Sequence, residues 1–168
     1  HTSRQVRRLA SEGSRPRLPW AMALPKLKNN PAPILPILEN LKQDSCEIVR
    51  RSVANSLNDI SKDNPQIMLD IAKKWKGSSE RIDAIIKHAS RTLLKAGHAD
   101  ILEHFELNSA DCQLVNFKVN TPKVNVGAHL EFQFSVVNTG LSPLQLRLEY
   151  AIYFKKNNGT LSKKVFKI

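Results

Sequence analysis

The chain has 168 residues, of which 41% are hydrophobic and 24% charged. This composition is that of an ordinary soluble globular protein with one large or two small domains, and it excludes collagen-like, low-complexity and largely disordered chains. No apolar run reaches the roughly 18 residues that a membrane span needs, so we expect no membrane segment. The formal net charge is +11. Such a balance favours a polyanionic partner, either nucleic acid or an anionic membrane surface.

Two features of the chain bear on its compartment and completeness. Cys46 and Cys112 are far apart and neither belongs to a Cys-x-x-Cys pair. This pattern argues against a disulfide framework or a zinc site and favours a reducing compartment, so we expect two inert thiols. The chain begins at His1 with no initiator Met and no charged-then-apolar leader. We therefore expect a processed chain or, preferably, a fragment.

Apolar residues recur at a spacing of three and four up to about residue 108, as helices require. Val6, Leu9 and Ala10 mark a first helix over about residues 3–12. The loop from Gly13 to Trp20 contains two prolines, which exclude helix there. The further helices are expected to start near Pro33 or Pro36, to run over about residues 45–61, to follow an N-capping Asn64, and to span Ser79 to Gly97.

The predicted helices repeat along the chain. The segment that begins Val6-Arg7-Arg8 matches the segment that begins Val49-Arg50-Arg51, and the last long helix aligns with the same stretch. The offsets bracket about 40 residues, which is the period of HEAT-type solenoids. In such solenoids one helix of each pair lines a concave inner surface.

After Asp111 the hydrophobic period changes to two. Alternating patterns predict strands around Val115–Val119, Leu130–Val136, Leu144–Ile152 and Leu161–Ile168, with a hairpin turn at Asn157–Gly159. Four such strands indicate an immunoglobulin-type antiparallel sandwich, which normally needs about seven. We thus predict an α + β protein of two domains: an α-solenoid of HEAT-like repeats over 1–108 and an incomplete immunoglobulin-like β-sandwich over 109–168. The incomplete sandwich is expected to be truncated, or to be completed by a partner such as a second copy of the chain.

Basic residues are expected to line one surface of the helices. On an ideal helix Arg51, Asn55 and Asp59 form a column opposite the apolar stripe, which points away from the core. Stacking the repeats extends this column into a basic track, whose members are Arg7, Arg8, Arg50, Arg51, Lys87, Arg91 and Lys95. The track fits a phosphate backbone, and His88 beside it is expected to contact phosphate or solvent. The alternative is an ordinary solvated charged face.

Two acids, Glu12 and Asp59, interrupt the basic track. An acid weakens binding to a polyanion, so its presence there needs a reason. One reason is an Arg–carboxylate pair that orients the arginine, such as Arg8 with Glu12 at i,i+4. The other is catalysis, in which a carboxylate offsets positive charge that develops in the substrate. The residues alone leave both explanations open.

Trp20 ends a loop that also carries Arg15 and Arg17. An indole beside carboxylates suits a cationic ligand, with which a cation–π contact is worth about 0.5–2 kcal/mol. The alternative is that Trp20 plugs the gap between two repeats. Trp75, by contrast, follows apolar residues at helical spacing and is expected to lie in the core.

The stretch Val6–Trp20, joined to Val49–Asp63, resembles the DNA alkylation repair family of HEAT-repeat DNA glycosylases, in particular its AlkC branch. Some AlkC members carry an immunoglobulin-like domain after the helices, so the resemblance covers nearly the whole chain. It implies base excision repair: removal of cationic 3-methyladenine and 3-methylcytosine from double-stranded DNA without flipping the nucleotide out. The family has further helices before this motif, with another acidic active-site residue, and we expect the chain to lack them.

The resemblance also assigns roles to individual residues. It matches the family's catalytic carboxylates to Glu12 and Asp59, its DNA-facing tryptophan to Trp20 and an active-site arginine to Arg8. We therefore expect Asp59 to be catalytic and not a structural partner of the arginines. The remaining candidates for DNA binding are Arg15, Arg17, Arg50, Arg51, Asn55, Lys87, His88, Arg91 and Lys95. No metal or cofactor is expected, and the protein is expected to act in the bacterial cytoplasm, at the nucleoid. The competing hypothesis is a noncatalytic HEAT scaffold that binds DNA or an acidic protein and releases no base.

Overall fold

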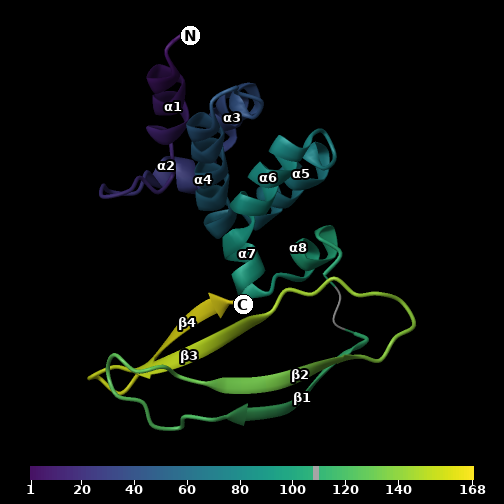
Figure 1. Cartoon of the computed structure of the whole chain (residues 1–168). Coiled ribbons are helices and arrows are strands. Elements are labelled where there is room, and N and C mark those ends of the chain that lie inside the picture. Colours follow the sequence, from purple (N-terminus) through teal and green to yellow (C-terminus); the bar gives the residue numbers. More distant parts are fainter. Residues whose placement is uncertain (108–109) are drawn as a thin grey trace. The chain divides into compact units, whose positions relative to one another are not determined.

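The computed structural model describes residues 1–107 and 110–168, which form two compact units, His1–His104 and Phe105–Ile168. The predicted domain boundary at residues 108 and 109 lies outside the described residues. The first unit is helical and the second contains antiparallel strands (Figure 1). The predicted fold class, a helical majority followed by a small immunoglobulin-like β-region, is confirmed. Within the described ranges, none of the helices has the length and apolar character to cross a membrane.

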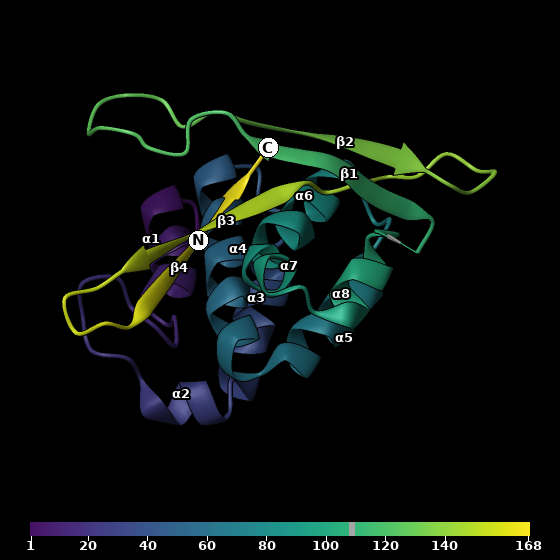
Figure 2. The ribbon, with the colours of Figure 1, turned by 90° about the horizontal axis from the view of Figure 1, so that it is seen from below.

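The helical unit is arranged around its longest helix, α4. Its elements are α1 (Arg4–Glu12), α2 (Pro25–Asn29), the 3₁₀ turn η1 (Ala32–Ile34), α3 (Leu35–Leu41), α4 (Glu47–Asp63), α5 (Pro65–Trp75), α6 (Glu80–Ala89), α7 (Arg91–Ala96) and α8 (Ala99–His104). Helix α4 lies between α1 and α6 in both ribbon views (Figures 1 and 2). Polar residues of α4 can therefore meet α1 on one side and α6 and α7 on the other.

Apolar packing fixes the orientation of α4. Val49, Val53, Leu57 and Ile60 form the predicted stripe and are fully buried. Burying each such side chain is worth about 1.5–3 kcal/mol relative to leaving it exposed. Trp75 is also buried, as predicted. The rotation of α4 about its axis, and hence the direction of its polar residues, follows from this core.

Helix α1 forms where it was predicted but packs differently. Val6 and Leu9, which mark it in the sequence, are exposed, and its one buried residue is Ser11. The Ser11 hydroxyl donates to the hydroxyl of Ser52 on α4, at 2.9 Å. The contact between α1 and α4 therefore includes a buried polar pair, close to the acid Glu12.

The predicted last long helix is interrupted at Ser90. Ser79 caps its start and Gly97, at a φ of 70°, ends it, as expected, but α6 and α7 are separate helices. The buried Asn58 side chain of α4 donates to the Ala89 carbonyl at 2.9 Å and to the Thr92 hydroxyl at 2.8 Å. Asn58 thus satisfies a carbonyl that the break leaves without a helical partner.

Other parts of the helical prediction need correction. Asn64 stands at the start of α5, but its amide donates to the Lys28 carbonyl at 2.6 Å instead of capping the helix. The prediction also missed α2 and α8, whose short apolar patterns are too brief to register as helical periodicity. Asn64 consequently ties α2 to the junction of α4 and α5.

The second unit has two two-stranded antiparallel sheets within the described residues. Strands β1 (Cys112–Val119) and β2 (Phe132–Asn138) form one sheet, and β3 (Glu149–Lys155) and β4 (Leu161–Lys167) form the other. The rings of Phe132 and Tyr150 lie 5.0 Å apart and join the two sheets. Gly159, at a φ of 82°, lies in the predicted turn between β3 and β4, which is confirmed.

Two strand predictions were wrong in detail. Strand β3 starts at Glu149 and not at Leu144, because the residues before it have no ladder partner in the described chain. A bulge at Asn116, whose φ is 56°, sets two β1 residues, Asn116 and Phe117, against the single residue Phe134 of β2. Val115 therefore faces the opposite side of the sheet from Val119, although simple alternation places them together.

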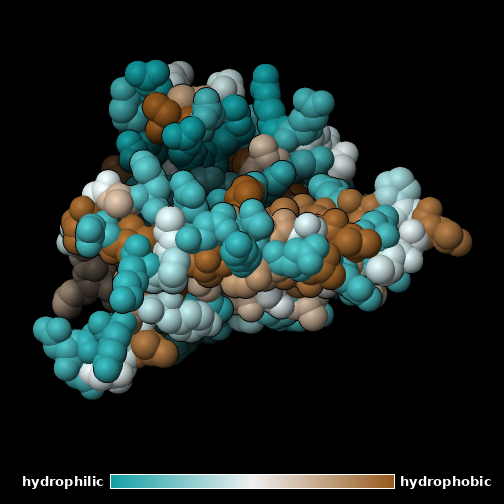
Figure 3. All heavy atoms as spheres, turned by 60° about the horizontal axis from the view of Figure 1, so that its bottom comes forward, coloured by the Kyte–Doolittle hydropathy of each residue, from teal (hydrophilic) through white to brown (hydrophobic). Residues whose placement is uncertain are grey.

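Apolar side chains are exposed on the surface of the second unit (Figure 3). They include Leu114, Phe117, Tyr153 and Phe154. Exposed apolar surface is compatible with the expected association with a second copy. That association stays a prediction.

Candidate functional site

The two acids predicted to be catalytic, Glu12 and Asp59, are joined by Arg15. The Arg15 Nη1 lies 2.6 Å from Glu12 Oε1, and its Nε lies 2.8 Å from Asp59 Oδ2. Asp59 is 1% exposed and Arg15 is 9% exposed. Residues that are far apart in the sequence thus form a cluster at the junction of α1, α4 and the loop that follows α1.

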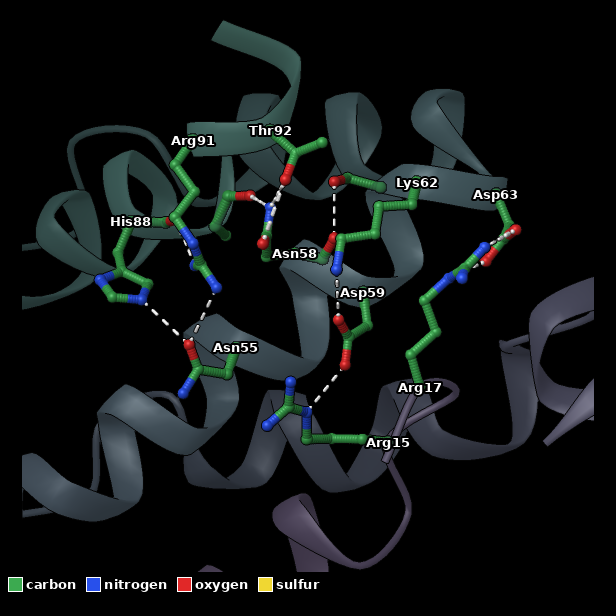
Figure 4. Close-up of polar contacts among 12 residues, drawn as sticks. Arg15, Arg17, Asn55, Asn58, Asp59, Lys62, Asp63, His88, Arg91 and Thr92 are labelled. Atoms are coloured by element: carbon green, nitrogen blue, oxygen red, sulfur yellow. Dashed lines mark hydrogen bonds and ion pairs between the residues drawn. The ribbon is translucent and has the colours of Figure 1, made fainter. Parts of the chain in front are cut away.

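The spacing of two arginines in the loop after α1 matches the spacing of two aspartates on α4. Arg17 forms two hydrogen bonds with Asp63, at 2.9 and 2.7 Å, one helical turn beyond the pair of Arg15 with Asp59 (Figure 4). Four residues of helix rise about 6 Å, and two residues of chain can reach at most about 7 Å. Two arginines two residues apart can therefore meet two aspartates four residues apart. This match holds the loop against α4.

Further donors surround the two carboxylates. The Ser52 hydroxyl donates to Glu12 Oε2 at 2.7 Å, and the Lys62 ammonium lies 2.9 Å from Asp59 Oδ1. Burial alone raises the pKa of Glu12, but hydrogen bonds from Ser52 and Arg15 hold it below its ordinary value. Glu12 is therefore anionic at neutral pH and is a poor proton donor.

These contacts correct three predictions. Asp59 does not point outward with Arg51, because the loop folds over the C-terminal part of α4 and buries it. The arginine that pairs with Glu12 is Arg15, not Arg8. Asp59 is also a structural partner of an arginine, contrary to expectation. The catalytic roles of both acids stay predictions.

A second polar group lies on the α6 side of α4. The Asn55 amide oxygen accepts from Arg91 Nη2 at 3.1 Å and lies 3.0 Å from His88 Nε2 (Figure 4). The other terminal nitrogen of Arg91 donates to the His88 carbonyl at 2.8 Å. No carboxylate of the described residues forms an ion pair with Arg91, and burial lowers the pKa of this guanidinium. A half-buried arginine with only neutral acceptors is suited to an anionic ligand.

The pKa of His88 is also lowered, by desolvation and by the charges of Arg91 and Arg51. His88 is therefore neutral at pH 7 and adds no charge to the predicted track. Its ring can still donate a hydrogen bond to a phosphate oxygen.

The rest of the predicted basic track is partly neutralised. Arg7 pairs with Asp44 at 2.6 Å, and Arg50 donates to the Asp44 and Ser45 carbonyls. Arg51 pairs with Glu47 at 2.7 Å. The members that are exposed and form no ion pair among the described residues are Arg8, Lys87 and Lys95. The free positive charge is thus less than the sequence predicted.

A groove of about 440 Å³ is lined by residues of α4 and α6. Its lining includes Arg50, Arg51, Arg81 and His88, but also Glu47 and Glu80. Mixed charges of this kind do not by themselves indicate a ligand.

Trp20 is fully exposed and has a φ of 61°. The alternative that it plugs a gap within the helical unit is therefore wrong. A non-glycine residue in the left-handed region is uncommon and costs energy, so the loop holds Trp20 in this position against its backbone preference. The indole is available to a ligand.

Sequence reasoning missed Ser52, Lys62 and the bridging role of Arg15. The signal for Arg15 was present, since Asp59 and Asp63 lie four residues apart on a helix and Arg15 and Arg17 alternate in a loop. Cys46 and Cys112 are free and half-buried. The described residues contain no group of three or more His, Cys, Asp or Glu side chains that could hold a metal ion.

Three comparisons with known proteins bear on this site. Residues 113–168 match the family model described as "Uncharacterised protein YhaZ, C-terminal Ig-like domain". The "Uncharacterized protein YhaZ" of Bacillus subtilis (strain 168) is 48% identical over 169 residues, which cover 100% of the chain and 47% of that protein. The structure of "Pseudomonas fluorescens alkylpurine DNA glycosylase AlkC bound to DNA containing an abasic site analog" matches with a TM-score of 0.94 and 38% identity, over 99% of the chain and 47% of AlkC.

The chain thus spans about half the length of the relatives it matches. Both the helical unit and the immunoglobulin-like unit take part in the match to AlkC, since it covers nearly every residue. The chain is a homologue of YhaZ and resembles the AlkC-type proteins of the DNA alkylation repair family in sequence and fold, as the motif around Glu12 and Asp59 predicts.

Proposed function

We propose that the protein is a DNA glycosylase of base excision repair that cleaves the N-glycosidic bond of cationic alkylated bases, 3-methyladenine and 3-methylcytosine. The observation that carries this proposal is the cluster in which the buried Arg15 joins the half-buried Glu12 to the buried Asp59. The likeness to AlkC, an alkylpurine DNA glycosylase bound to DNA with an abasic site analog, supports it.

The chemistry of the reaction fits a site built from two carboxylate side chains. An alkylated base already carries positive charge, so it leaves as a neutral molecule and needs no general acid. The sugar left behind gains oxocarbenium character, which a nearby carboxylate stabilises. The lowered pKa of Glu12 agrees with this role, because a general acid requires a raised pKa. Glu12 and Asp59 would stabilise the sugar cation and position the attacking water.

Trp20 would contact the lesion. Its indole is fully exposed, so it can meet a base from outside without a deep protein pocket. A cation–π contact favours a charged base over a neutral one by about 0.5–2 kcal/mol. The proposal therefore includes excision without rotation of the nucleotide out of the duplex.

Several cations would hold the DNA backbone. Arg91, fixed by Asn55, and the exposed Arg8, Lys87 and Lys95 are the candidates on the helical unit. Strand β4 adds Lys163 and Lys167. They share one face of the β3–β4 sheet, because residues an even number apart on a strand point to the same side. Each phosphate contact steepens the salt dependence of binding to duplex DNA by about 0.9 in log–log slope.

Product analysis tests the proposal. The full-length protein is incubated with methylated duplex DNA, and the released bases are separated and identified by mass spectrometry. We expect free 3-methyladenine and 3-methylcytosine, and none with a Glu12→Gln/Asp59→Asn protein that still binds DNA. If the folded wild-type protein binds the DNA and releases no alkylated base, the protein is a noncatalytic scaffold.

A further inference from the structure

The guanidinium of Arg15 is turned toward two carboxylates and is largely shielded from solvent. It is 9% exposed, and two of its nitrogens are already hydrogen-bonded to carboxylates. Its Nε and Nη1 point to different acids, so the planar fork defines the separation and relative orientation of the two carboxylates. Because little of the side chain reaches solvent, a phosphate has little access to its remaining N–H groups.

Without a cation between them, the half-buried carboxylate of Glu12 and the buried carboxylate of Asp59 would repel each other. Lys62 neutralises only Asp59, at 2.9 Å, and Ser52 contributes a neutral hydrogen bond to Glu12. Arg15 is therefore the one side chain that makes ion pairs with both acids among the residues the structure describes.

We propose that Arg15 is a positioning residue, which acts on excision only through Glu12 and Asp59 and not through contact with DNA. This inference rests on the proposed glycosylase function. It requires that loss of Arg15 disturb the geometry of both acids and the protonation of Glu12 while DNA binding is retained.

The test compares Arg15→Gln and Arg15→Lys in the full-length protein. Lysine keeps the charge but has a single nitrogen, which cannot bridge the two acids as the guanidinium fork does. We expect single-turnover release of 3-methyladenine to slow by about 10- to 100-fold in both variants, with DNA affinity and its salt slope unchanged. Lys42→Gln, which removes the separate ion pair of Lys42 with Glu39 at the C-terminal end of α3, is the matched control and is expected to keep wild-type excision.

The pH profile separates positioning from simple structural support. Since Arg15 lowers the pKa of Glu12, its loss should move the acid limb of the excision rate to higher pH, and more so in Arg15→Gln than in Arg15→Lys. A profile that superimposes on the wild type, or a fall in DNA affinity equal to the fall in rate, would overturn the proposal.

A measurement that does not depend on catalytic activity also tests whether Arg15 controls Glu12. In Arg15→Lys, which keeps a cation at the site and is the variant better suited to fold, ¹³C NMR titration should show Glu12 protonating at higher pH than in the wild type. An unchanged titration would refute the positioning role. If the wild-type protein releases no base, the proposed function fails, but this titration still decides whether Arg15 controls Glu12.

Discussion

Replacing Asp59 by asparagine separates a catalytic role from a structural one. Asp59 accepts hydrogen bonds from Arg15 at 2.8 Å and from Lys62 at 2.9 Å, and it is buried. Asparagine has one acceptor oxygen, so one charge-assisted hydrogen bond is lost, at a cost of about 1.5–3 kcal/mol. Arg15 keeps Glu12, so the cost stays below the roughly 3–5 kcal/mol of a fully broken buried pair.

The kinetic effect of Asp59→Asn should be distinct from this loss of stability. If the carboxylate stabilises an oxocarbenium ion, excision should slow by about 100-fold or more, a barrier change of about 2.7 kcal/mol. DNA affinity should hold or increase, because a negative charge near the DNA is removed. The assay is single-turnover release of 3-methyladenine at a temperature where urea unfolding shows the variant to be folded, with DNA affinity measured in parallel.

Asp63→Asn is the matched control. It removes the neighbouring Arg–Asp pair with Arg17, in which both side chains are more exposed. Exposed pairs are worth about 0–1 kcal/mol, so excision should change by less than about fivefold. Near-normal excision by folded, DNA-bound Asp59→Asn, or equal losses in the two variants, would refute the catalytic assignment.

Three further outcomes are expected. Arg91→Gln should weaken DNA binding and reduce the log–log salt slope by about 0.9, as measured by fluorescence anisotropy at several salt concentrations; an unchanged slope would exclude a phosphate contact. Trp20→Ala should leave the midpoint of thermal unfolding unchanged, since the indole is exposed, but reduce the preference for 3-methyladenine over neutral bases by about 2- to 30-fold; an unchanged preference would exclude the cation–π contact. Hydrogen bonds from Arg7 and Arg17 lower the pKa values of Asp44 and Asp63, so their stabilisation is present above the ordinary pKa of about 3.9 and is lost as the pH falls toward the lowered values. Urea unfolding should show stability decreasing from about pH 5 to pH 3, and a smaller decrease in Arg17→Gln.

Local patterns predicted most of the helical unit. The stripe Val49, Val53 and Leu57 set both the presence and the rotation of α4, because burying apolar side chains dominates its packing. The break at Ser90 could not be predicted, since it depends on Asn58, which reaches it from another helix. The same holds for the bulge at Asn116, where a single added residue reverses the faces of the strand.

The sequence predicts the two acidic residues of the site, but it does not predict the ion pairs that join them. Glu12 and Asp59 were identified because acids interrupt a basic surface and match a family motif. The burial of Asp59, and the bridge from Asp59 to Glu12, depend on a loop that folds back on α4, which helical periodicity does not encode. Helical spacing likewise predicted Arg8 as the partner of Glu12, because an i,i+4 pair lies within one helix. The actual partner, Arg15, lies in the loop after that helix.

The central claim is that Glu12 and Asp59 stabilise a cationic sugar. The most direct test measures the affinity of the full-length protein for two duplexes that differ only at one abasic position, which carries either a cationic pyrrolidine or a neutral tetrahydrofuran. Transition-state analogues bind more tightly than neutral ground-state analogues when the site is complementary to the developing charge. We predict that the wild-type protein prefers the cationic duplex. Glu12→Gln/Asp59→Asn should lose this preference while binding the neutral duplex as tightly as the wild type does. Equal affinity of the wild-type protein for the two duplexes, or a preference that survives in the double variant, would contradict it.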